Sequence, residues 1–239
     1  MFSPDSAEES LAKDHQSFAA VEEHANDTQR PRFVSRGSEG WPRMIENPLK
    51  SIKLWSRPEI LASPCPVPKE PGLYAWFFRN VPGVPKDGCL ERHGFNLLYV
   101  GISPARPPTN GRPPSRQTLR DRVRFHMAGN AEGSTLRLTL GCLLSETLSC
   151  GLRRTGSGSR MILAEGEDDL NTWLAANAQV GWLVQTEPWL LEHKLIQTLS
   201  LPLNLLDNKH HAFHPVLSKR RSEARRQAEQ LPIWNPKAK

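Results

Sequence analysis

The fold of this chain is decided by the stretch Leu97-Leu98-Tyr99-Val100-Gly101-Ile102-Ser103, taken together with the earlier Pro71-Gly72-Leu73-Tyr74-Ala75-Trp76-Phe77-Phe78. Each is a short apolar run bounded by Gly, Pro, Asn or Ser, which is typical of a strand buried on both faces. Because side chains alternate along a strand, Tyr74 and Tyr99 can share one face of two adjacent strands. The sequence therefore predicts two phenols in one site.

The composition points to a basic globular protein. The chain has 239 residues, of which 38% are hydrophobic, and a formal net charge of +6. That length can bury one sizeable core, no apolar run approaches the length of a membrane span, and the charge favours a polyanionic partner. The four cysteines lack CxxC spacing, which argues against a zinc site or a disulfide framework. The N-terminus has no basic and apolar leader, so we expect a cytoplasmic protein.

The composition also predicts three parts. Residues 1–40 are acidic and poor in apolar residues, so we expect them to be disordered. Apolar residues become dense from Trp41, and residues 41–214 are expected to form the folded domain. Residues 215–239 are expected to form a basic helix and tail.

Two connections flank the second strand. Residues 79–95 contain several prolines and glycines, which predict a long hairpin link rather than a third element. Residues 104–116 form a loop rich in proline that cannot be a helix or an inner strand. This loop carries Arg106, Arg112 and Arg116, which we assign to attraction towards a phosphate backbone.

A helix is predicted to follow this loop, from about Leu119 to Ala128. Thr118 is a good N-cap, Asp121 stands at the capping-box position and Gly129 offers a stop. An apolar stripe at four-residue spacing forms the buried face of this helix. The polar residues beside that stripe are then the candidates for a functional role on this helix.

Arg122 and His126 are four residues apart and project from one side of this helix. A fixed guanidinium suits the negative charge that accumulates on a phosphate under attack by an oxygen. The alternative is that Arg120, Arg122 and Arg124 form an ordinary solvated basic face. We expect Arg120 and Arg124 to contact nucleic acid.

The pattern predicts four further elements before residue 186. They are a helix over residues 134–148, a short strand over residues 160–164 after a basic turn at residues 151–158, a helix over residues 167–177, and a strand over residues 180–185. The last of these is a candidate third strand of the sheet.

A helix predicted over residues 188–199 carries a carboxylate on an apolar side. The helical neighbours of Glu192 are Trp189, Leu195 and Ile196, and an unpaired charge among such residues is costly. The carboxylate therefore needs a cation. The alternative is a rim residue that reaches water or pairs with an arginine.

The end of the chain is basic. A metal site could be formed by three histidines, His210, His211 and His214. No cysteine or acidic ligand accompanies them at the spacing of a zinc site, so contacts with phosphate or water are favoured. A last helix is predicted over residues 215–230. Its Arg220 and Arg221 are expected to contact the DNA backbone, or else form a solvated face.

The tripeptides Gly72-Leu73-Tyr74 and Tyr99-Val100-Gly101 resemble the two motifs that give the GIY-YIG nucleases their name. Four further positions agree with that family in order, namely Arg122, His126, Glu192 and Asn204. The run over residues 190–204 is similar to the corresponding run in bacterial excision-repair nucleases of the family. The long link over residues 79–95 is a departure that some restriction-endonuclease members share.

The resemblance implies an α/β (α+β) core, a small three-stranded antiparallel sheet flanked by helices, and hydrolysis of DNA phosphodiester bonds. It implies a single divalent metal, Mg²⁺ or Mn²⁺, held by Glu192, with no small-molecule cofactor. Glu187 is the competing ligand, but its position at the helix start also suits the helix dipole.

The resemblance also implies roles for the other residues. Tyr74 would act as general base, Tyr99 would orient water or phosphate, and Arg122 would stabilise charge on the phosphate. His126 would assist by hydrogen bonding or proton transfer. Asn204 would position phosphate or organise the site, although a lone asparagine also forms turns. The alternative function is a DNA-binding or assembly module that does not cut.

Overall fold

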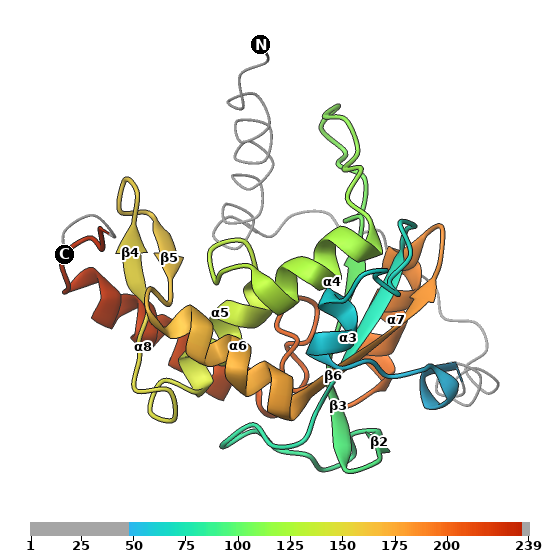
Figure 1. The fold of residues 1–239 in the computed structure, drawn as a ribbon, viewed down its shortest axis with the longest axis horizontal. Helices are drawn as coiled ribbons and strands as arrows, with labels where there is room; N and C mark the ends of the chain where they lie inside the picture. Colours follow the sequence, from blue (N-terminus) through green and yellow to red (C-terminus); the bar gives the residue numbers. More distant parts are fainter. Residues whose placement is uncertain (1–47, 236–239) are drawn as a thin grey trace. The chain divides into compact units, whose positions relative to one another are not determined.

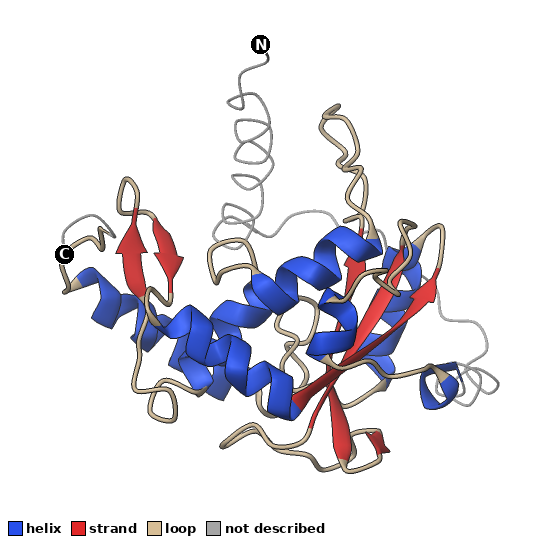
Figure 2. Cartoon of the chain, viewed as in Figure 1, coloured by secondary structure: helices blue, strands red, loops and turns tan. Residues whose placement is uncertain are grey.

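The computed structural model describes residues 48–235 of the chain (Figure 1). Residues 1–40, which the sequence predicts to be disordered, lie outside the described residues, as does the start of the apolar region at Trp41. The described residues form one sheet with helices on both sides and a second, two-stranded hairpin (Figure 2). The predicted α+β class, with an antiparallel sheet flanked by helices, is therefore confirmed.

The sheet contains four strands rather than the predicted three. They are β1 (Gly72–Phe78), β2 (Glu91–Arg92), β3 (Phe95–Ser103) and β6 (Ala178–Val184), in the order β2-β3-β1-β6 with antiparallel neighbours. The strand predicted over residues 180–185 corresponds to β6. Every residue of β1 is buried, as expected for a central strand covered on both faces.

The extra strand comes from a tight turn inside the link between β1 and β3. The two residues of β2 pair with Phe95 and Asn96, which leaves His93 and Gly94 as a two-residue loop. Both loop residues have positive φ, 52° and 78°, the combination that matches the twist of the flanking strands. The prediction of a link without an element is wrong here, because histidine is a weaker turn signal than asparagine or aspartate.

The helices cover the two faces of the sheet. They are α3 (Arg57–Leu61), α4 (Leu119–Ala128), α5 (Thr135–Leu143), α6 (Gly166–Asn177), α7 (Pro188–Thr198) and α8 (His214–Glu229). All but α3 are predicted from the sequence, but α5 ends five residues before the predicted position 148, where Ser145 bonds back to the carbonyl of Cys142 at 3.4 Å. Within residues 48–235, none of the helices has both the length and the apolar character needed to cross a bilayer.

A second hairpin pairs β4 (Arg153–Thr155) with β5 (Arg160–Ile162). The strand predicted from residue 160 corresponds to β5. Residues 151–158, which the sequence predicts to be only a turn, contain β4, and this prediction is wrong because a run of Arg, Arg and Thr shows no apolar alternation. Gly156 and Gly158, with φ of 59° and 95°, form the turn between the strands.

The sheet separates two apolar clusters. On one face, the even-numbered aromatic residues of β1 pack against the apolar stripe of α4 and residues of α5, α6 and α8. On the other face, the odd-numbered residues of β1 pack against Leu195 and Ile196 of α7. Helix α4 packs on the face of the sheet that carries Tyr74.

Candidate active site

Tyr74 and Tyr99 lie on the same face of the sheet. In the register of β1 and β3, Trp76 is opposite Tyr99 and Tyr74 is opposite Gly101. Tyr74 and Trp76 are two residues apart and share a face, so Tyr99 belongs to that face as well. The Tyr99 side chain is also close enough to hydrogen-bond Tyr74. The structure therefore brings the two phenols together.

Gly101 leaves the space that the Tyr74 ring occupies. A Cβ atom on Gly101 would lie 2.5 Å from Tyr74 Oη and 2.7 Å from its ring carbon Cε2. Both separations are far inside van der Waals contact. The glycine of one tripeptide is thus required by the tyrosine of the other.

The cap of α4 fixes where its polar side chains lie. The Asp121 amide donates to Thr118 Oγ1 at 3.3 Å, and the Thr118 amide donates to the Asp121 carboxylate at 2.9 Å. With the apolar stripe packed on the sheet, Arg122 is only 9% exposed and His126 is fully buried. The alternative of a solvated basic face is therefore wrong for Arg122.

His126 connects β1 to the start of α5. Its Nε2 lies 3.0 Å from Tyr74 Oη, and its Nδ1 lies 2.6 Å from Ser134 Oγ. Burial, together with the positive charges of Arg122 and Arg137, lowers the pKa of His126 well below its usual value. The imidazole is therefore neutral near pH 7, with one N–H to donate and one nitrogen to accept.

Arg122 is held against the two tyrosines. One of its guanidinium nitrogens donates to the carbonyl of Gly133 at 2.8 Å, and the guanidinium also hydrogen-bonds Tyr74. Burial by itself lowers the pKa of Arg122, but the interactions with Tyr74 and Tyr99 outweigh it and the net shift is upward. A permanent positive charge therefore stands beside both phenols.

Both phenols are neutral in the metal-free protein at ordinary pH. Burial raises the pKa of Tyr74, and the guanidinium of Arg122 opposes that rise. Burial also raises the pKa of Tyr99, and the neighbouring Tyr74 adds to the rise. A phenol that acts as a base here needs further positive charge, or hydrogen-bond donors directed at its oxygen.

Glu192, on α7, is close enough to both phenols to raise their pKa values. Burial raises the pKa of its own carboxyl group to about 7, and Asp207 contributes to that rise. Among residues 48–235, Glu192 makes no hydrogen bond or ion pair. A part-buried carboxylate without a partner is costly, and such a group is a suitable ligand for a divalent cation.

The rest of a cation's coordination shell would come from outside the protein. The described part of the chain holds no group of three or more His, Cys, Asp or Glu side chains that could bind a metal ion. Mg²⁺ commonly takes one or two carboxylates and completes its shell with water and substrate phosphate. Glu192 fits that pattern.

Asn204 is committed to the backbone of β3. The Val100 amide donates to Asn204 Oδ1 at 3.0 Å, and Asn204 Nδ2 donates to the Val100 carbonyl at 2.8 Å. The side chain is only 6% exposed. Since Val100 lies between Tyr99 and Gly101, Asn204 holds the strand that carries the second tripeptide, and its amide is occupied rather than directed at a phosphate.

The arginines expected on α8 and in the loop after β3 differ in exposure. Arg112, Arg116 and Arg220 are exposed. Arg221 is only 5% exposed, and its charge acts on Tyr99 and on Cys142 of α5. The alternative of a solvated face is therefore wrong for Arg221, because α8 packs against α5 on this side, and its contact with a DNA backbone stays a prediction.

Arg120 and Arg124 are half-buried and tie α4 to the segment before β1. Arg120 Nε donates to the carbonyl of Val67 at 2.6 Å, and one Arg124 nitrogen donates to the carbonyl of Ile60 at 3.4 Å. These bonds give both residues a structural role beside the expected contact with nucleic acid.

The remaining candidates have ordinary surroundings. Glu187 is exposed at the N-cap position of α7. His211 accepts a hydrogen bond from the Phe213 amide at Nδ1 (3.1 Å), and its Nε2 lies 3.1 Å from Ser200 Oγ. Both ring nitrogens of His211 are therefore engaged by neighbouring residues, and the structure does not support a metal role for this histidine.

Two supporting residues are not apparent from the sequence pattern. Ser134 is recognisable as a helix cap but not as the partner of His126. Arg137 is fully buried and donates to Glu167 Oε2 at 2.6 and 3.1 Å and to the carbonyl of His126 at 3.2 Å. The sequence held one signal for Arg137, a basic residue inside the leucine-rich run of α5. Such a residue is expected to be buried, and a buried charge requires a partner.

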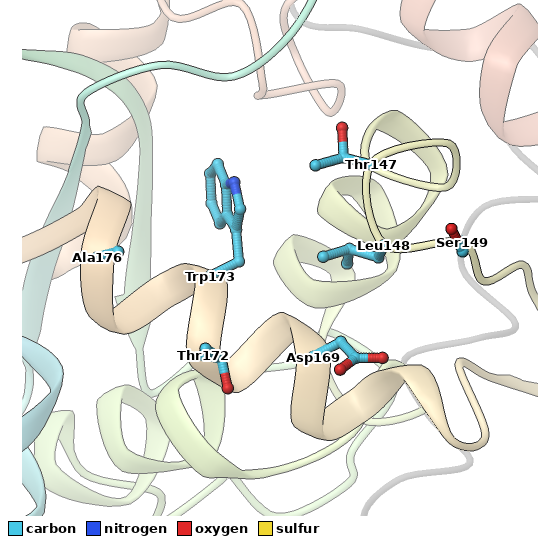
Figure 3. A pocket seen from close by; sticks show the side chains of 7 residues that line it. All are labelled: Thr147, Leu148, Ser149, Asp169, Thr172, Trp173 and Ala176. Atoms are coloured by element: carbon cyan, nitrogen blue, oxygen red, sulfur yellow. The ribbon is translucent and has the colours of Figure 1, made fainter.

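A pocket lies away from these residues, between α6 and the turn that follows α5 (Figure 3). Its walls are formed by Thr147, Leu148, Ser149, Asp169, Thr172, Trp173 and Ala176. None of the six predicted site residues lines it, so it is not part of the site.

The fold and the site define a class: a small α+β domain in which two phenols and a guanidinium come together, with a part-buried carboxylate near enough to raise the pKa of both phenols. The family model described as the GIY-YIG catalytic domain matches residues 72–225, and the chain belongs to this family. Membership indicates a nuclease of endonuclease type that acts on DNA, in a family that generally uses a divalent metal. The comparisons with curated proteins and with solved structures gave no match.

Proposed function

We propose that this protein is a metal-dependent endonuclease that hydrolyses DNA phosphodiester bonds at one site. The residues of that site are Tyr74, Tyr99, Arg122, His126, Glu192 and Asn204. The observation that carries the proposal is the 3.0 Å contact between Tyr74 Oη and the neutral His126, with the Arg122 guanidinium on the same phenol. Membership of the GIY-YIG family supports the class of reaction.

In this proposal Tyr74 first releases its phenolic proton to solvent, and the phenolate then accepts a proton from the attacking water. The developing charge on the phosphate is stabilised by the fixed guanidinium of Arg122, which needs no reorganisation during the reaction. Tyr99 is partly exposed beside Tyr74 and orients the water or the phosphate. His126 acts on Tyr74 through a hydrogen bond, and Asn204 keeps β3 in place through Val100.

Glu192 is the proposed ligand for Mg²⁺ or Mn²⁺. When bound, such an ion polarises the scissile phosphate and lowers the pKa of a coordinated water. The carboxylate suits this role because it is part-buried, close to both phenols and without a partner among the described residues. A pure binding module would need the arginines but not this carboxylate.

A plasmid-nicking assay with Mg²⁺ or Mn²⁺ tests the proposal. The wild type is expected to cut, and Glu192→Ala to lose at least about 100-fold in rate while it still binds DNA. Glu187→Ala is the matched control, because it removes an exposed carboxylate from the same helix and is expected to leave the rate unchanged. Equal cutting by wild type and Glu192→Ala would exclude Glu192 from the site. Binding without any metal-dependent cutting by the wild type would instead favour the module that does not cut.

A further inference from the structure

Ser134 has two hydrogen-bond partners among the described residues. Its Oγ accepts a bond from the Arg137 amide at 3.1 Å, which makes it the N-cap of α5, and lies 2.6 Å from His126 Nδ1. The residue is fully buried. A hydroxyl group has one proton to donate, and the amide of Arg137 cannot receive it because it is itself a donor.

Within the part of the chain that the structure describes, the hydroxyl proton of Ser134 therefore has one acceptor, the Nδ1 atom of His126. An imidazole that accepts at Nδ1 carries its single proton at Nε2. The opposite tautomer would direct two donors at Ser134 Oγ and leave its buried hydroxyl proton without an acceptor, which is costly. The hydrogen bonds thus select one of the two neutral forms of His126.

We propose that Ser134 is a positioning residue that fixes His126 in its Nε2–H form, so that His126 and Arg122 both donate hydrogen bonds to Tyr74 Oη. The Nε2 atom lies 3.0 Å from that oxygen, and the guanidinium of Arg122 bonds the same phenol. Two donors on one oxygen favour its negatively charged form. In this arrangement His126 stabilises the Tyr74 phenolate rather than removing the phenolic proton.

The consequence for catalysis rests on the proposed function, but the tautomer does not. With Arg122 and His126 both donating to Tyr74 Oη, Tyr99 is the remaining hydrogen-bonding neighbour among the described residues, and its oxygen can accept the proton of the neutral phenol. When Tyr74 loses that proton, the hydrogen bond from Tyr99 instead lowers the pKa of Tyr74. Tyr99 is partly exposed, so the released proton has a route to solvent. Loss of the Ser134 hydroxyl should then slow the chemical step more than it weakens DNA binding.

The test is the tautomer of His126 in the full chain, measured by two-bond ¹H–¹⁵N NMR correlation with ¹⁵N-labelled histidine. The chain has 8 histidines, and the His126→Gln spectrum identifies the signals of His126. We expect the Nε2–H pattern in the wild type and in Ser134→Thr, which keeps the hydroxyl. We expect a shift towards the Nδ1–H form in Ser134→Ala and Ser134→Gly, which lack it.

Ser134→Gly separates the hydroxyl from the cap, because glycine is nearly as good as serine at an N-cap whereas alanine is not. It carries the test if Ser134→Ala fails to fold. An Nδ1–H pattern in the wild type would overturn the proposal. So would an Nε2–H pattern that persists in both variants, because the serine would then not determine the tautomer.

Cleavage kinetics provide the second measurement. We expect kcat to fall about tenfold in Ser134→Gly with little change in KM, and to recover in Ser134→Thr. A rise in KM at unchanged kcat would contradict a role at Tyr74. If the wild type does not cut DNA at all, the proposed function fails while the NMR result still decides the tautomer.

Discussion

Tyr74 and Gly101 illustrate how closely residues are matched in this site. The phenol lies where a side chain on Gly101 would be, and it is only 2% exposed. Such packing transmits small changes directly to the reacting groups, because a close-packed interior leaves no free space to absorb them.

Gly101→Ala is therefore expected to displace the Tyr74 ring. The added methyl would meet Tyr74 Oη at 2.5 Å, and overpacking of this kind costs about 1–3 kcal/mol of stability. A displacement of about 1 Å costs roughly 100-fold in rate. Gly151→Ala is the control, since a Cβ there meets nothing within 4 Å and its φ is ordinary. Urea unfolding and plasmid nicking measure the two effects, and equal behaviour of the two variants would contradict the packing argument.

The raised pKa of Glu192 predicts how the free energy of unfolding depends on pH when a chelator keeps metal ions from the protein. Its folded-state pKa is about 7, against an ordinary value of 4.5. The folded state therefore retains a proton that the unfolded state releases, so the stabilising effect is complete below about pH 4.5 and is lost as the pH rises to about 7. The free energy of unfolding should fall by roughly 2 kcal/mol across this window, after allowance for partial exposure.

Urea unfolding at pH 5 and pH 8 would measure this change. Glu192→Gln should remove this part of the pH dependence, whereas Glu187→Gln should keep it. His126 is present in every protein compared, so its own pH dependence cancels in the difference. A gap between wild type and Glu192→Gln that stays constant with pH would contradict the prediction.

At the scale of elements, α5 and α6 are joined by an ion pair whose arginine is fully buried. Arg137 is fully buried, and Glu167 accepts its guanidinium at 2.6 Å as well as the amides of Ala131 (2.7 Å) and Leu163 (3.1 Å). The carboxylate thus connects two chain segments to the helix pair. The same guanidinium reaches the carbonyl of His126, which links this ion pair to α4.

Removal of one partner of this pair should destabilise the protein strongly. Arg137→Met leaves the Glu167 charge without its cation, and Glu167→Gln leaves a buried guanidinium, so each should cost about 3–5 kcal/mol. The pair Arg160–Glu132, whose arginine side chain is 50% exposed, is the control, and Glu132→Ala should cost less than about 1 kcal/mol. Denaturant unfolding measures all three variants. The double variant should cost less than the sum of the two single variants, and simple additivity would argue against a coupled pair.

Elements with local signals were predictable. The bounds of α4 follow from Thr118, Asp121 and Gly129, because a capping box and a stop act over a few residues. β2 and β4 were missed because each is held by a partner strand and a turn of positive φ rather than by an apolar pattern. The early end of α5 was missed for a similar reason, since a serine bond to a preceding carbonyl competes with the helix.

At the scale of the molecule, the site joins segments that are far apart in the chain. The sharing of a face by Tyr74 and Tyr99 could be predicted from strand alternation, and the spacing of Arg122 and His126 from helix geometry. The bond between Asn204 and Val100 and the bond between Ser134 and His126 could not, because they depend on how distant elements pack. Residue types therefore indicated the chemistry, and packing decided which atoms meet.

We expect the loop of residues 104–116 to hold DNA beside this site. It leaves the end of β3 and returns to the cap of α4, and Ser103 Oγ donates to the Thr118 carbonyl at 2.9 Å across its base (Figure 1). Its Arg106, Arg112 and Arg116 are exposed, and the loop contains no acidic residue. The two elements that carry Tyr99 and Arg122 are thus joined by a basic segment.

Replacement of these three arginines by alanine should weaken DNA binding without unfolding the protein. Each phosphate contact contributes about 0.9 to the slope of log K against log salt concentration, so the slope should fall by about 3. The charge-matched comparison replaces the exposed Lys219, Arg220 and Arg226 of α8, the helix that carries the other arginines predicted to contact DNA. Salt titrations of binding by fluorescence anisotropy compare the two triple variants. Only residues that displace counterions from DNA alter that slope. An unchanged slope in the loop variant, together with a reduced slope in the α8 variant, would therefore show that DNA binds along α8 rather than along the loop.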